Sequence, residues 1–413
     1  MSNNLFKWLY PGIKVKRWML AALFGVLIVG FGSIFAVYPY PFVSRLGIII
    51  ILCGIVFVVL GMGQMTVSLI TLFLPKRERD IVNILYRRRY LERGPKVVAI
   101  GGGQGLSHVL LGLKEYTANL TAIVTVADSG GSSGRLREEF NIVAPGDIRN
   151  CLVALADAPA LMGQLFQYRF AEGDGLKGHN FGNLFLTAMV QLTGGDFQKA
   201  VEESSKVLAI RGKVIPSTVH NVHLVAEYVD GSRTEGEAKI PKKNIPIKHL
   251  FLKPEDAQPT PEALMAIAQA DIIVMGPGSL YTSILPNLII KGMPEAIVRS
   301  AAYKIYVCNV MTQRGETDGF SACDHVRAMV AHAHPQVLDA CIINDAQVPP
   351  EALKRYRSED SYPVTADGES IKSLGCKVVA TDLLSVADYV RHDSTKLTQA
   401  LIKLIETQRV IKR

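Results

Sequence analysis

Glycine-rich turns are the features of this 413-residue chain whose types and spacing most clearly indicate chemistry. The first turn, Gly101–Gly105, directly follows the apolar run Val97–Ile100 and leads into Leu106–Leu113, which has helical spacing. A strand that passes through glycines into a helix presents bare backbone N–H groups and the positive end of the helix dipole to an anion. We therefore predict a phosphate or diphosphate site here, lined by Gly102, Gly103, Gln104 and Gly105.

A second glycine turn, Asp128–Gly134, follows the apolar run Thr121–Ala127. Hydroxyl and guanidinium groups beside glycines are suitable partners for phosphate oxygens. The expected phosphate ligands are Ser132, Ser133 and Arg135.

Asp128 places a carboxylate at the start of that second turn. It could bind a ribose or base group, or hold Mg²⁺ beside a diphosphate, because protein-bound Mg²⁺ often takes one or two carboxylates together with substrate phosphates. The alternative is an Asx turn, in which the side chain only organises its own loop.

Two further turns follow predicted strands in the same way. Gly276–Ser279 follows Asp271–Met275, and Asn309–Gln313 follows the run that begins at Lys304. Ligands of open parallel sheets lie beyond the carboxyl ends of the strands, so we expect all four turns to meet. These two turns contribute Gly276, Gly278, Ser279, Asn309, Thr312 and Gln313 as candidate ligand residues.

Polar residues also gather at two predicted helix starts. Asp147 is expected to cap the helix over 148–156, which leaves Arg149 and Asn150 to face a ligand. Asn183 stands in a glycine-flanked segment with His179, where a polar side chain serves either the loop or a ligand.

Several other kinds of site are disfavoured. The first turn reads G-x-G-x-x-L, which lacks the third glycine of the dinucleotide fingerprint, and it lacks the Gly-Lys-Ser/Thr ending of a P-loop. His220 and His223 would face opposite sides of one extended run, which argues against a shared zinc ion. Arg137 could be either a ligand or a surface charge.

The elements around these residues alternate between short apolar strands and helices from Val97 onward. This alternation predicts an α/β domain over 96–413, a Rossmann-like, mostly parallel sheet covered by helices on both faces. Predicted helices include Gly163–Phe170 and Leu184–Leu192, and 232–260 reads as a hairpin and loop extension.

The first 75 residues predict a membrane hairpin. Residues 18–44 and 46–74 contain no Lys, Arg, Asp or Glu, and about 20 apolar residues suffice to cross a bilayer, so we expect transmembrane helices at about 18–38 and 46–74. A basic connector over 76–95 follows, whose helix would either lie on anionic lipid headgroups or remain solvated. Basic flanks on both sides place both termini and the main domain in the cytoplasm, with the protein in the cell membrane.

The net charge of +8 comes from this N-terminal part. Residues 1–96 carry 13 Lys and Arg against 3 Asp and Glu, whereas residues 97–413 carry 32 against 34, so composition gives no support for nucleic-acid binding by the main domain. The six cysteines are scattered without a C-x-x-C pair, which predicts reduced thiols and no zinc site.

Six motifs together closely resemble the YvcK family of gluconeogenesis factors, a branch of the CofD-like superfamily. They are GGGQGLS (101–107), VTVADSGGSSGRLR (124–137), PGDIRNCLVAL (145–155), HNFGNL (179–184), VMGPGSLYTSILPNL (274–288) and YVCNVMTQRGETD (306–318). Ser129 stands where family members commonly carry a second Asp, and Gln104 and Arg314 replace Thr and Pro.

The resemblance implies a cytoplasmic domain that binds UDP-N-acetylglucosamine or a related nucleotide sugar, in a protein linked to gluconeogenic growth and to cell shape. We expect Tyr356 and Arg391 to reach the uracil or the diphosphate. The resemblance favours a regulator of unidentified partner proteins over an enzyme. The alternative is a Mg²⁺-dependent phosphotransferase like the 2-phospho-L-lactate transferases, in which Asp128 would hold the metal and be catalytic. The sequence leaves open whether the chain forms a homo-oligomer.

Overall fold

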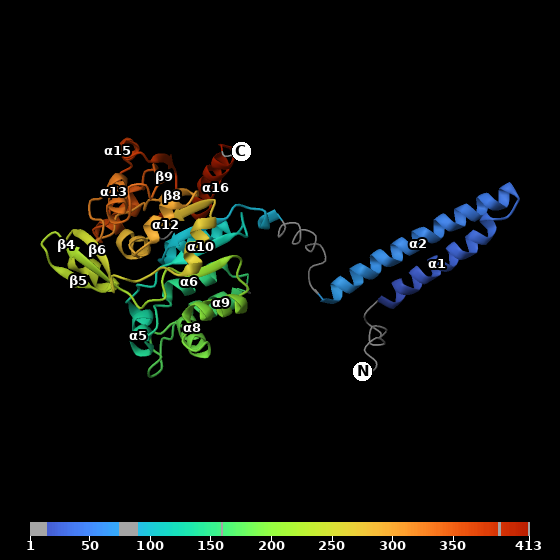
Figure 1. Cartoon of the computed structure of the whole chain (residues 1–413), viewed down its shortest axis with the longest axis horizontal. Coiled ribbons are helices and arrows are strands. Elements are labelled where there is room, and N and C mark those ends of the chain that lie inside the picture. Colours follow the sequence, from blue (N-terminus) through green and yellow to red (C-terminus); the bar gives the residue numbers. More distant parts are fainter. Residues whose placement is uncertain (1–14, 74–89, 158–159, 387–389, 412–413) are drawn as a thin grey trace. The chain divides into compact units, whose positions relative to one another are not determined.

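The computed structural model describes residues 15–73, 90–157, 160–386 and 390–411, and the chain divides into two compact units, Met1–Arg88 and Arg89–Arg413 (Figure 1). Most of the predicted connector, residues 76–89, lies outside the described residues.

Two long apolar helices, α1 (Val15–Ala36) and α2 (Pro41–Phe73), form an antiparallel hairpin in the first unit (Figure 1). Within them, the 20 residues Arg17–Ala36 and the 28 residues Pro41–Ser68 are long and apolar enough to cross a membrane. The predicted helices are therefore present, but the second begins five residues earlier than expected, because the turn between them is short.

Glycines at a seven-residue spacing bring the two helices of the hairpin close together. A Cβ atom added at Gly47 would lie 2.3 Å from the backbone nitrogen of Ala36, and one at Gly54 would lie 2.8 Å from the carbonyl oxygen of Gly25. A third such contact lies at Gly61, next to Ala22. We call this line of close contacts at Gly47, Gly54 and Gly61 the glycine seam. Small residues at such positions let helix backbones approach closely, which is how helices associate in lipid.

The second unit contains a seven-stranded sheet in which every paired strand runs parallel to its neighbour, in the order β10-β9-β8-β7-β1-β2-β3. Helices flank it, which confirms the predicted Rossmann-like class (Figure 1). The strands are β1 (Val97–Gly101), β2 (Leu120–Val124), β3 (Lys213–Pro216), β7 (Ile272–Met275), β8 (Tyr303–Val307), β9 (Ala340–Asn344) and β10 (Lys377–Thr381).

Helices surround the sheet, and most of them bury apolar residues in one core with its strands. They are α4 (Gly103–Leu113), α5 (Gly131–Phe140), α6 (Gly146–Leu155), α7 (Ala160–Gln167), α8 (Phe181–Leu192), α9 (Phe197–Val207), α10 (Pro261–Gln269), α11 (Leu285–Leu288), α12 (Met293–Arg299), α13 (Ala322–His332), α14 (Pro350–Arg357), α15 (Gly368–Ser373) and α16 (Ser394–Ile411). One π-helical turn, η3 (Leu280–Ile284), precedes α11.

A separate antiparallel sheet projects from one side of the domain (Figure 1). It contains β5 (Arg233–Glu235), β4 (His223–Tyr228) and β6 (Ile247–Lys253), in that order, and the 3₁₀-helix η2 (Glu237–Lys243) connects β5 to β6. The expected hairpin and loop over 232–260 is therefore two strands, β5 and β6, and a helix, and the two strands pair with β4 on its two sides. A two-stranded ribbon, β11 (Leu384–Val386) and β12 (Val390–His392), lies near the C-terminus.

Several predicted boundaries in the second unit are wrong. The strand expected to reach Ala127 ends at Val124, because the next apolar residues are buried in a loop rather than paired. The helix α5 begins inside the second glycine turn, although no helix was expected there. The helices α7 and α8 each begin three residues earlier than predicted, and the Asn180 side chain caps α8 by accepting from the Asn183 N–H.

The glycine seam of the hairpin makes a prediction about its stability. Replacing Gly54 by Leu should destabilise the packed helices by roughly 1–3 kcal/mol, because the added side chain overlaps the facing backbone. Replacing Gly63, around which an added Cβ meets nothing within 4 Å, should have little effect. Denaturation of the detergent-purified chain, followed by fluorescence of Trp8 and Trp18, measures both variants. Equal losses of stability in the two variants would contradict the close packing at Gly54.

Candidate functional site

The four glycine or polar turns follow four adjacent strands, β8, β7, β1 and β2, at the carboxyl edge of the sheet. From β1, the chain goes on to β2 and β3 on one side, and later returns to β7 and β8 on the other. The strand order thus reverses beside β1. Open α/β sheets bind ligands in the crevice at such a switch point.

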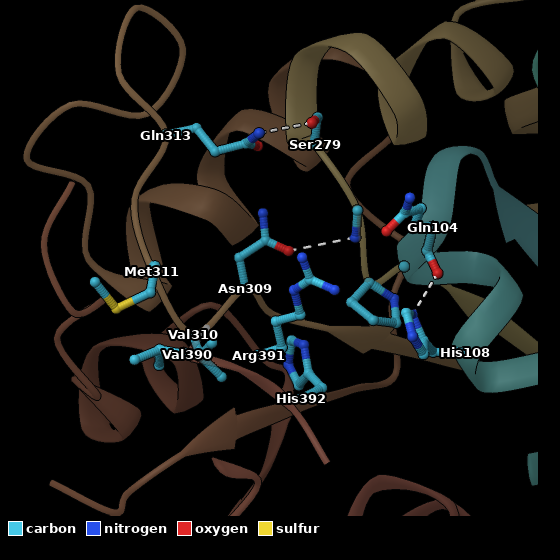
Figure 2. Close-up of a pocket in the computed structure, with 13 residues that line it drawn as sticks. Gln104, His108, Ser279, Asn309, Val310, Met311, Gln313, Val390, Arg391 and His392 are labelled. Atoms are coloured by element: carbon cyan, nitrogen blue, oxygen red, sulfur yellow. Dashed lines mark hydrogen bonds between the residues drawn. The ribbon is translucent and has the colours of Figure 1, made fainter. Parts of the chain in front are cut away.

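A cavity of about 270 Å³ lies at this switch point. Figure 2 shows residues from the start of α4, the turn after β7, the loop after β8 and strand β12 around it. Its polar lining includes Gln104, His108, Ser279, Asn309, Gln313, Arg391 and His392. Two hydrogen bonds join the turns: the Gly278 N–H donates to Asn309 Oδ1 at 3.3 Å, and Gln313 Nε2 donates to Ser279 Oγ at 2.8 Å (Figure 2).

The glycines of the first turn are required by close contacts between elements. A Cβ atom at Gly105 would lie 2.3 Å from the carbonyl oxygen of Pro277, so only glycine lets α4 touch the turn after β7. Gly103 has φ +64°, which favours glycine. Gly278, on the facing turn, also lines the cavity.

Asp128 and Asp147 lie beside this turn. The Asp128 Oδ1 accepts from the Gly130 N–H at 2.8 Å, so the Asx turn left open by the sequence is formed. The expectation that Asp147 caps α6 is wrong: Pro145 occupies that position, and Asp147 instead accepts from the backbone N–H of Gly103. Burial, then the charge of Asp128, raises the pKa of Asp147 to about 7.

Five predicted ligand residues form a largely buried polar network next to Asp147. Asn183 Nδ2 donates to Ser132 Oγ and to Ser133 Oγ, each at 3.2 Å. Arg149 donates to Asn183 Oδ1 at 3.0 Å and to Asn150 Oδ1 at 2.7 Å. Burial, and to a lesser degree Arg169, lowers the pKa of Arg149 to about 10. These residues lie together but do not line the cavity.

Other candidates have structural hydrogen bonds away from the cavity. Thr312 Oγ1 accepts from the Tyr362 N–H at 2.9 Å, and the Tyr356 hydroxyl accepts from the Val390 N–H at 2.8 Å. Tyr356 thus holds β12, whose Arg391 does line the cavity. Arg135 is exposed and donates to the Lys177 carbonyl at 3.1 Å.

Arg137 is not the surface charge that the sequence allowed. It is 2% exposed and donates to Asn221 Oδ1 at 2.6 Å and to the carbonyl oxygen of Val222. Its guanidinium therefore ties α5 to the segment before β4. As for metals, no group of three or more His, Cys, Asp or Glu residues that could hold an ion occurs within the described parts of the chain.

Sequence reasoning missed two carboxyl groups with raised pKa values, the half-buried Glu237 and the buried Glu316. Burial, then the charges of Asp128, Asp147 and Glu316, raises the pKa of Glu237 on η2 to about 7. Glu316 is 6% exposed, its Oε1 accepts from Thr282 Oγ1 at 3.1 Å, and burial raises its pKa to about 7. Glu316 stands inside a quoted motif, whereas no local pattern marks Glu237.

His392 is another residue that the sequence did not single out. Its Nε2 donates to the Cys308 carbonyl oxygen at 3.0 Å, and burial lowers its pKa to about 4. It therefore stays neutral and fixes the end of β12 against β8.

Comparisons with known proteins indicate the same family as the sequence motifs. Residues 97–384 match the family described as 2-phospho-L-lactate transferase CofD. A crystal structure of a protein from Bacillus halodurans is similar with a TM-score of 0.74 and 46% identity, covering 75% of this chain and all of that one.

Relatives of two lengths are found. A putative gluconeogenesis factor from Nostoc is 46% identical over 97% of this chain and 92% of its own length. The gluconeogenesis factor of Bacillus subtilis is 47% identical over 76% of this chain and 98% of its own length. The longer relative thus spans nearly the whole chain, and the shorter one matches about the extent of the second unit. The chain belongs to the gluconeogenesis factor family, the YvcK family, which carries a CofD-like domain.

Proposed function

We propose that this gluconeogenesis factor is a membrane-tethered regulator whose domain binds a nucleotide sugar, with UDP-N-acetylglucosamine as the leading candidate. Its binding would connect the supply of this cell-wall precursor to gluconeogenic growth and cell shape. The observation that carries the proposal is the cavity at the switch point beside β1, between the turns after β1 and β7.

The lining of the cavity suits a uridine diphosphate group. Arg391 and the amides of Gln104 and Asn309 lie around it, together with the glycine turns, while the Gln313 amide donates to Ser279 Oγ (Figure 2). A uracil and a diphosphate carry mostly acceptor oxygens, and cationic or amide donors are their natural partners. A volume of about 270 Å³ suits part of such a ligand, with the remainder along the carboxyl edge.

The proposed membrane tether is the helical hairpin of the first unit. Its two helices have the length and composition of membrane spans. Basic residues flank the pair on both sides, which favours cytoplasmic termini and a cytoplasmic domain.

A phosphotransferase is the second candidate, because the matched family is described as 2-phospho-L-lactate transferase. Asp128 and Asp147 would fit the one or two carboxylates that Mg²⁺ takes beside a diphosphate. When bound, the metal would neutralise charge on the phosphates. The acceptor oxygen would form a new P–O bond while the P–O bond to the departing nucleoside monophosphate breaks, and the acceptor proton passes to solvent.

Isothermal titration with UDP-N-acetylglucosamine tests binding. The wild-type protein should release heat with saturable binding, and Arg391→Ala should weaken the affinity by roughly 10- to 100-fold through loss of a charged hydrogen bond. Arg327→Ala is the matched control, because Arg327 is exposed on α13 and pairs with Asp324. No heat with millimolar ligand would refute the proposal. A separate incubation of the protein with UDP-N-acetylglucosamine and a phospholactate-type acceptor tests the transferase. Release of nucleoside monophosphate by the wild type, and its loss in Asp128→Asn, would favour this second candidate.

Affinity should also depend on pH. With its pKa raised to about 7, Asp147 is neutral below that pH and anionic above it. The diphosphate diester keeps its charge throughout, so repulsion should weaken binding by about 3- to 10-fold from pH 6 to pH 8. Asp147→Asn should reduce this dependence, while the exposed Asp256→Asn should leave it unchanged. A flat wild-type profile would contradict the assignment.

Fractionation of cells tests the tether. The whole chain should stay with the membrane fraction after a carbonate wash, because two apolar spans are buried in lipid. A chain that lacks residues 1–95 should become soluble. Release of the whole chain by the wash would exclude the tether.

A further inference from the structure

The cavity at the switch point has two walls that belong to different apolar clusters. One wall is formed by the turns after β1 and β7, whose strands lie in the main core. Figure 2 shows Val310, Met311 and Val390 across the cavity from α4. These three side chains are buried in a second, smaller cluster, separate from the main core, together with Val348 and Leu384. The second wall is therefore held in place by far fewer buried side chains than the first.

The helix α14 covers this small cluster. Ala352, Leu353 and Tyr356 are partly buried and pack against it. Their spacing places them on one side of the helix, whereas Glu351 and Lys354 are exposed to solvent. The cavity wall and α14 thus share the same five buried residues.

Hydrogen bonds also connect α14 to the two segments that supply this wall. The Tyr356 hydroxyl accepts from the Val390 N–H at 2.8 Å, which ties the end of α14 to β12. After the helix, the chain returns along the loop that follows β8, where the Val364 N–H donates to the Val310 carbonyl oxygen at 3.0 Å. Both segments that fix the position of α14 therefore line the cavity.

The polar residues proposed to hold the ligand are the sequence neighbours of these wall residues. Asn309 precedes Val310 in the loop after β8, and Arg391 follows Val390 in β12, and both line the cavity. A ligand bonded to Asn309 and Arg391 would hold both segments at once. Because a ligand stabilises the conformation that binds it, this contact would stabilise the small cluster and α14 with it.

We propose that α14 and the β11–β12 ribbon form a ligand-dependent clamp, in which filling the cavity determines how firmly α14 is held against the domain. Elements held by few buried apolar contacts open locally more easily than a main core. Opening of α14 would break the cavity wall, so a bound ligand must oppose it. This inference rests on the proposed function, and it names α14 as the surface that differs between the free and the bound regulator.

Hydrogen exchange of the full-length protein in detergent tests the clamp. With UDP-N-acetylglucosamine at about 100 times its Kd, the amides of α14 should exchange up to about 100-fold more slowly, because α14 opens only after the ligand leaves. The amides of α9, which packs on the main core, should change by less than about twofold.

A variant in the small cluster tests the same coupling from the other side. Leu353→Ala should weaken binding of UDP-N-acetylglucosamine by about 10-fold, because the wall is formed in a smaller fraction of the molecules. Saturating ligand should restore the slow exchange of α14 in this variant. Leu165→Ala is the matched control, because Leu165 is 39% exposed on α7, away from the cavity lining.

Each outcome decides the inference. Unchanged exchange of α14 in a wild-type protein that binds the ligand overturns the clamp, and so does equal slowing in α14 and α9. Unchanged affinity in a folded Leu353→Ala variant overturns it as well. The wild-type exchange experiment needs no variant, so it decides even if Leu353→Ala fails to fold. Failure of the wild type to bind the ligand instead refutes the proposed function.

Discussion

The close approach of the α4 turn to its neighbours is the constraint on which the site depends. An added Cβ at Gly102 would lie 2.5 Å from Asp147 Oδ2, and one at Gly105 would lie 2.3 Å from the Pro277 carbonyl oxygen. The glycines therefore allow a carboxyl on one side and the turn after β7 on the other to touch the same backbone. A side chain at Gly105 would separate α4 from the turn after β7, which together line the cavity, and one at Gly102 would displace Asp147.

The contact between Asp147 and the first glycine turn affects where an anion could bind. Bare N–H groups at a helix start usually attract an anion. Here Asp147 already accepts from the Gly103 N–H, so this N–H is not free for an anion, and the proposed diphosphate site is the cavity lined by Gln104, Gly105 and Arg391. The turn thus separates the carboxyl of Asp147 from the cavity that Arg391 lines.

Three carboxyl groups near the turn have raised pKa values. Burial raises the pKa of Asp147, Glu237 and Glu316 to about 7, which means that the folded state disfavours their charged forms. A folded protein gains little stability from such groups unless they are paired. Their concentration at one edge of the sheet is typical of functional sites, where strained electrostatics are retained for ligand contact.

The sequence by itself determined the fold class, the apolar hairpin, the four turns at one sheet edge and the family, because each depends on residues close together in the chain. Strand and helix periodicity, glycine after an apolar run, and hydrophobic length are all local signals. Only the tertiary structure decided which polar residues adjoin the ligand region. Asp147 bonds Gly103 rather than capping α6, Tyr356 and Thr312 hold the backbone, and Glu237 reaches Ser129 across more than a hundred residues. Those contacts depend on how the sheets and loops pack, and local sequence patterns carry no record of such long-range pairings.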